Sequence, residues 1–108
     1  MEMTYKVQVK VPLGIRKGKM WLQVNNGIIV GELELLGTVE KIEGVLSKDG
    51  AIHLKGNLAS PIRCITYTGT GTIRNGTIQL KMENGRNIYL LTGVLLDEKG
   101  ISKDEEVL

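Results

Sequence analysis

The chain has 108 residues, of which 42% are hydrophobic and 24% charged, a balance that excludes the low-apolar, highly charged composition of a disordered protein. Its 14 basic residues nearly cancel its 12 acidic ones, and the formal net charge of +2 is too weak to collect nucleic acid or an anionic membrane over a distance. A chain of this length supports one hydrophobic core, so we expect one domain.

Glycine is frequent in this chain and proline is rare. The 14 glycines stand beside two prolines, a combination typical of turns and bulges in a sheet. The single cysteine, Cys64, cannot form an internal disulfide, and residues 1–11 lack the uninterrupted apolar stretch of a signal peptide. The apolar runs also fall far short of the roughly 18 residues that cross a bilayer. We therefore expect a cytoplasmic protein with no membrane partner.

Polar and apolar residues alternate along most of the chain, which is the pattern of strands with one dry face. The apolar stretches recur about every 8 to 12 residues with turn residues between them, the spacing typical of a sandwich or barrel. In chain order, the expected strands cover residues 3–11, 19–24, 28–35, 39–46, 52–58, 63–73, 78–82 and 87–96.

The segment 39–46 also fits a short helix, because its apolar residues are spaced three to four apart behind Thr38, a candidate N-cap. Gly44 in the middle of the segment and the short length of the segment favour a strand instead.

Short turn signals separate the expected strands. Asn26–Gly27, Asn75–Gly76 and Asn84–Gly85 are typical of tight hairpin turns, and Asp49–Gly50 predicts another turn. Such short connections make neighbouring strands pair antiparallel in sequence order, since parallel pairs need long crossovers. Closure of the sheet then removes its exposed edges. We predict an all-β fold in which about eight antiparallel strands form an up-and-down meander closed into a barrel.

The last expected strand is apolar on both faces, more than one barrel interior can hide. We predict that Tyr89, Leu91 and Leu95 face outward and bury against a second copy of the chain in a symmetric homodimer. The acidic C-terminal tail, residues 98–108, follows the barrel domain of residues 1–97 and could cover these side chains instead.

A set of residues, many of them glycines, is distributed along the chain from about Tyr5 to Gly93. Its members are Pro12–Gly14, Lys17–Gly18, Gly27, Gly31, Leu36–Gly37, Gly44, Asp49–Gly50, Leu54–Leu58, Pro61, Tyr67, Gly69, Gly71, Gly76 and Thr92–Gly93. This set resembles that of a family of small uncharacterised bacterial proteins whose fold is of the lipocalin and avidin type, the calycin barrel. The resemblance implies a lipocalin-like barrel and transfers no catalytic residue.

Glycines on the expected inward faces leave space inside the barrel. The functional interpretation is a small apolar cavity with Tyr67 as its polar handle. Its other expected lining residues are Leu22, Leu33, Leu54, Leu80 and Leu90. The alternative is that the glycines let the strands coil tightly while the leucines close the gaps.

No reactive set of residues converges in the sequence. His53, the only histidine, has no second metal ligand near it, so we expect a solvated surface residue. Cys64 beside Arg63 has no histidine base, and Glu32 and Glu34 are expected to form exposed cross-strand charge pairs. We therefore expect no metal, no cofactor and no catalytic residue, although distant strands could still bring polar groups together at a barrel mouth.

The densest basic cluster is Arg16, Lys17 and Lys19, which could hold a phosphate or a carboxylate. Trp21 beside it suggests a nucleic-acid surface, but only 4% of the residues are aromatic, and we expect no nucleic-acid partner. Two hypotheses for the function follow. One is a non-catalytic barrel that binds a small apolar molecule, and the other is an interaction module that acts as a homodimer or on a protein partner.

Overall fold

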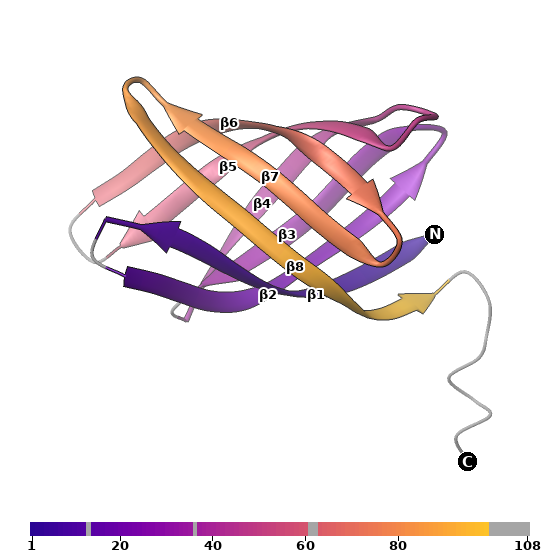
Figure 1. Cartoon of the computed structure of the whole chain (residues 1–108), viewed down its shortest axis with the longest axis horizontal. Coiled ribbons are helices and arrows are strands. Elements are labelled where there is room, and N and C mark those ends of the chain that lie inside the picture. The colour runs from indigo at the N-terminus through magenta and orange to yellow at the C-terminus, as the bar shows by residue number, and fades with distance from the viewer. Residues whose placement is uncertain (13, 36, 61–62, 100–108) are drawn as a thin grey trace, which may run out of the picture.

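The alternating residues form eight strands, and the computed structural model describes residues 1–12, 14–35, 37–60 and 63–99. The strands are β1 (Glu2–Val11), β2 (Gly14–Asn25), β3 (Ile28–Leu35), β4 (Thr38–Leu46), β5 (Ala51–Ser60), β6 (Arg63–Arg74), β7 (Thr77–Asn84) and β8 (Asn87–Lys99). Each pairs antiparallel with the next, and β8 pairs with β1, so the sheet closes into a barrel (Figure 1). The predicted all-β meander is confirmed, and the part of the chain that the structure describes contains no helix.

The asparagine-glycine turns fix the hairpins. Asn26 and Gly27 have φ values of 52° and 78°, as do Asn75 and Gly76, and positive φ at both central residues defines the predicted type I′ turn. The third turn is shifted by one residue, because Asn84 pairs with Asn87 and its central residues are therefore Gly85 and Arg86.

The connections lie at two ends of the barrel. The terminal end holds the start of β1, the last residues of β8, and the turns after β2, β4 and β6, and it lies on the right in Figure 1. The distal end holds the last residues of β1, β3, β5 and β7 and the first residues of β2, β4, β6 and β8. The predicted tail lies, apart from residues 98 and 99, outside the described residues.

The core fills the barrel between these ends. Every strand contributes inward-facing side chains, and those of Leu22, Leu33, Leu54, Tyr67 and Leu80 are 0–3% exposed. Large residues stand opposite the inward glycines in the ladders, with Gly31 paired to Leu22, Gly44 to Leu54 and Gly71 to Leu80. These contacts support the interpretation in which leucines close the space that the glycines leave.

The inward face of β8 was predicted wrongly. Leu91 is fully buried, and Tyr89 and Leu95 pack against the core, whereas Leu90 is 51% exposed on the outer surface. The turn between β7 and β8 is the physical reason. The inward residues of β7 have even numbers, and a two-residue turn places odd-numbered residues opposite them, such as Leu91 opposite Leu80.

Candidate functional site

The wall of the barrel opens at the distal end between β4 and β5. Their ladder runs from the pair of Leu46 and Ile52 to the pair of Ile42 and Gly56 and stops there, although both strands continue. Residues 57–60 of β5 therefore pair only with β6.

The hairpin of β5 and β6 thus ends in a two-stranded segment, residues 57–60 and 63–66, which we call the distal arm. The β6 part of the arm does not join the β7 ladder, which begins at Thr68. The Asn84 side-chain amide of β7 donates a hydrogen bond to the Thr66 carbonyl oxygen and so ties the arm to β7. The arm leaves one side of the barrel mouth unpaired.

A hollow of about 120 Å³ lies beside the arm at this mouth, and we call it the distal hollow. Its apolar lining consists of Val9, Val11, Leu33, Leu35, Leu58 and Ala59, and its polar lining of Arg16, Thr38, Glu40 and Asn57. The lining comes from five strands, β1 to β5. The hollow is thus an apolar recess with a polar rim.

Two of the four polar groups at the rim already have partners. The Thr38 hydroxyl donates to the Leu35 carbonyl oxygen at 2.8 Å, and the Asn57 side-chain oxygen accepts from the Thr66 hydroxyl at 2.9 Å. Within the described residues, Arg16 and Glu40 form no ion pair and no side-chain hydrogen bond. Both charged groups are partly buried and remain able to bind a ligand.

We call the unpaired stretch between β4 and β5, beyond Ile42 and Gly56, the seam. Tyr67 lies at the place where this seam begins. A Cβ atom on Gly56 would stand 2.9 Å from the Tyr67 hydroxyl oxygen and 2.9 Å from the Lys41 carbonyl oxygen. The Tyr67 hydroxyl and the Lys41 carbonyl therefore lie next to Gly56, which belongs to the last pair of the β4–β5 ladder. The Tyr67 side chain is 1% exposed, and its hydroxyl has no hydrogen-bond partner among the described residues. Burial raises the pKa of Tyr67 to about 12. A buried hydroxyl without a partner destabilises the fold by about 1–3 kcal/mol.

We expect Tyr67→Phe to stabilise the protein at neutral pH by about 1 kcal/mol and to reduce its sensitivity to alkaline pH. The pKa of tyrosine rises from 10.0 to about 12 on folding, so the unfolded chain loses this proton first. The free energy of unfolding should therefore fall as pH rises from about 10 to about 12, by on the order of 2 kcal/mol. Urea denaturation of the wild type and the Tyr67→Phe variant across this pH range measures the difference. An equal dependence of the free energy of unfolding on pH in the two proteins would contradict the raised pKa of Tyr67.

The distal hollow includes only part of the predicted cavity. Leu33 lines the hollow, whereas Tyr67, the predicted polar handle, is not among its lining residues and lies at the seam. Leu22, Leu54 and Leu80 are packed in the core and do not line the hollow, and Leu90 lies outside.

Arg16 was not predicted to line a hollow, because it was grouped with its basic neighbours in the chain. Arg16 pairs with Val9, and both line the distal hollow, whereas Lys17 and Lys19 are exposed on the outer surface. The signal was present in the alternation of β2, because Arg16 has the same parity as the buried Met20.

The other candidate residues lie apart from the distal hollow. His53 and Cys64 are exposed, and Glu32 and Glu34 have Lys41 and Lys19 as cross-strand neighbours. Among the described residues, no three His, Cys, Asp or Glu side chains are grouped closely enough to hold a metal ion.

Comparison of the chain with models of protein families, with curated proteins and with solved structures gives no match. The described residues include no helix with the length and apolar character needed to span a membrane. The site is therefore defined from this chain alone. The chain forms an eight-stranded closed barrel whose β4–β5 ladder stops before the distal end.

Proposed function

We propose that the protein is a non-catalytic, lipocalin-like binding barrel that takes a small apolar ligand at the distal hollow. The observation that carries the proposal is an apolar recess at the unpaired seam, lined also by Arg16 and Glu40, which have no ion-pair partner in the described structure. The core behind the recess is filled, so the ligand enters the mouth and not the middle of the barrel.

The volume of the hollow sets the size of the ligand. Engineered apolar cavities of about 150 Å³ admit benzene, so a hollow of about 120 Å³ suits an aliphatic group of about five carbons. The head group of such a ligand stays at the polar rim, where Arg16 and Glu40 can bind it. Burial of the aliphatic part supplies about 0.8 kcal/mol for each CH₂ group.

A titration with three five-carbon probes tests this proposal and identifies the preferred head group. Pentanol, pentanoate and pentylamine are five-carbon compounds that differ in the charge of the head group, so we expect Arg16 and Glu40 to discriminate among them. We expect at least one probe to shift the methyl NMR signals of Leu33 and Leu58, while those of Leu22 and Leu80 stay unchanged. Absence of shifts with all three probes, or shifts of the core methyl groups alone, would refute the proposal.

An interaction module is the second candidate, favoured by the outer surface of β8. Ile88, Leu90, Val94 and Leu96 are 51–54% exposed there and form an apolar row that the exposed Thr92 interrupts. This row replaces the predicted interface of Tyr89, Leu91 and Leu95, which face the core. If the row joins two copies of the chain, light scattering at high concentration should give the mass of a dimer and Leu90→Lys should give a monomer. A wild-type monomer would remove the homodimer.

The lipocalin-like family and the cytoplasmic location belong to the proposal as predictions from the sequence. A binding barrel of this kind needs no cofactor, and its polar groups serve recognition only.

A further inference from the structure

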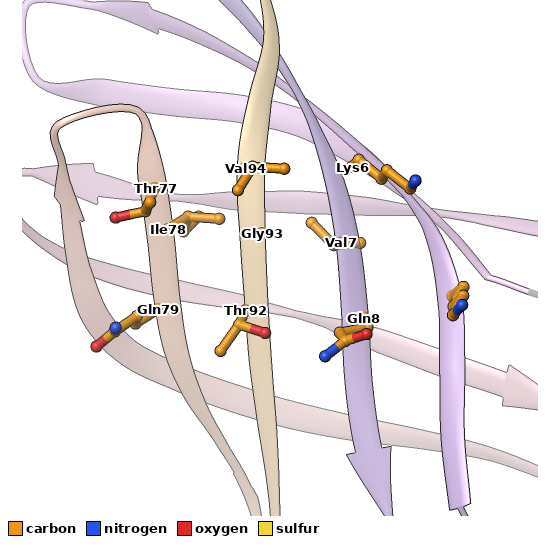
Figure 2. A pocket seen from close by; sticks show the side chains of 10 residues that line it. Lys6, Val7, Gln8, Thr77, Ile78, Gln79, Thr92, Gly93 and Val94 are labelled. Atoms are coloured by element: carbon orange, nitrogen blue, oxygen red, sulfur yellow. The ribbon is translucent and has the colours of Figure 1, made fainter.

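A second hollow, of about 420 Å³, lies on the outer surface of the barrel over β7, β8 and β1 (Figure 2). We call it the outer polar hollow. Its lining residues are Lys6, Val7, Gln8, Lys17, Thr77, Ile78, Gln79, Thr92, Gly93 and Val94. It shares no lining residue with the distal hollow, and its volume falls within the range of about 300–1,000 Å³ typical of small-molecule sites.

Two cross-strand rows build the floor and sides of the outer polar hollow. In one row, Thr92 of β8 lies between Gln79 of β7 and Gln8 of β1, and in the other, Val94 lies between Thr77 and Lys6 (Figure 2). The central strand thus carries short side chains, and three of the four flanking side chains are longer or charged. This difference in length makes the surface concave.

The outer polar hollow is cationic. Its lining contains two lysines and no carboxylate, and neither Lys6 nor Lys17 forms an ion pair within the described residues. Lys6 lies directly opposite Lys19 in the β1–β2 ladder, a like-charge pair that is unfavourable in a sheet. Glu34 is the other neighbour of Lys19 and offsets its charge, whereas the other cross-strand neighbour of Lys6 is the uncharged Val94. A bound anion would relieve the repulsion.

The uncharged groups of the lining can recognise hydroxyl groups. The side chains of Gln8, Gln79 and Thr92 make no hydrogen bond within the described residues, and each offers donor and acceptor atoms together. Thr77 already donates to the Arg74 carbonyl oxygen at 2.8 Å and can still accept. The lining has no aromatic residue on which a nucleobase could stack.

We propose that the outer polar hollow binds an anionic sugar, whose phosphate or carboxylate lies between Lys6 and Lys17 and whose hydroxyl groups contact Gln8, Gln79 and Thr92. This inference goes beyond the proposed function, since the two hollows are separate.

Titration by NMR tests the inference with glucose 6-phosphate and glucuronate, compared with glucose and inorganic phosphate. We expect at least one of the two anionic sugars to shift the signals of Gln8, Gln79 and Thr92. Glucose and inorganic phosphate should each bind at least about tenfold more weakly, because glucose lacks the anionic group and inorganic phosphate lacks the sugar hydroxyl groups. The stronger of the two anionic sugars distinguishes a phosphate from a carboxylate. Equal binding of glucose, equal binding of inorganic phosphate, or no binding of either anionic sugar would overturn the inference.

A charge-matched pair of double variants separates specific binding from general attraction. Lys6→Gln with Lys17→Gln should weaken binding of the anionic sugar by about tenfold or more, while Lys41→Gln with Lys48→Gln changes the net charge equally and should leave it nearly unchanged. Equal losses in both double variants would show that only the net charge matters and would overturn the inference. Binding by Leu58→Trp, which obstructs the distal hollow, should equal that of the wild type, so the two proposals fail independently.

Discussion

Gly71→Ala is expected to lower the free energy of unfolding by about 3 kcal/mol or more, whereas Gly69→Ala changes it by about 1 kcal/mol or less. Both glycines face the interior from β6. A Cβ atom on Gly71 would overlap the backbone carbonyl oxygen of Gln79, so the two strands would have to separate. The atoms nearest to a Cβ atom on Gly69 would be side-chain carbons of Leu80, at 3.0 Å, and a side chain can move more easily than the backbone.

Guanidinium denaturation monitored by the fluorescence of Trp21 measures both variants. If the glycines served only to make the chain flexible, both alanine variants would be stabilised by up to about 1 kcal/mol, because alanine restricts the unfolded chain. Equal effects at the two positions would therefore contradict the steric account of how this barrel coils.

Leu80→Ala should lower the free energy of unfolding by about 4 kcal/mol, near the upper part of the range for buried leucines. Leu80 is 2% exposed, its side-chain carbons lie against Gly69 and it pairs with Gly71, and neither glycine has a side chain that could fill the cavity. Adding Gly69→Ala to this variant should recover about 1 kcal/mol, because the new methyl group enters the space that Leu80 vacates.

Leu90→Ala is the matched control for Leu80→Ala. Leu90 is 51% exposed on the outer surface of β8, so its loss should change the free energy of unfolding by about 0.5 kcal/mol or less. A large loss of stability in Leu90→Ala would restore the original prediction that this residue faces the core. If the effects of Leu80→Ala and Gly69→Ala on the free energy of unfolding are additive in the double variant, the two side chains do not compete for the same space.

Much of the barrel is predictable from local pattern. Strand positions follow from the alternation of residues, and the two type I′ turns follow from Asn26–Gly27 and Asn75–Gly76, because few residues adopt positive φ without strain. Alternation assigns the inward face wherever the opposite face is polar. It failed in β8, where both faces are apolar and only the register with β7 decides between Leu90 and Leu91.

The distal hollow was less accessible to sequence analysis. Residues 38–41 and 57–60 continue as strands, so nothing local indicates that their ladder stops at Ile42 and Gly56. Arg16 was assigned to a surface cluster because of its neighbours in the chain, although its parity places it with the inward residues. Tyr67 was predicted to be a polar handle, and its place beside the seam depends on the closure of the whole barrel.

The most direct test of the central claim, that the distal hollow holds a small aliphatic ligand, compares two tryptophan variants. Leu58 and Leu46 are both partly buried against the core, and Leu58 lies at the distal hollow while Leu46 lies at the terminal end. Binding of the best five-carbon probe, measured by NMR titration, should be abolished by Leu58→Trp and retained by Leu46→Trp, with both variants folded by circular dichroism. Undiminished binding by folded Leu58→Trp would contradict the claim.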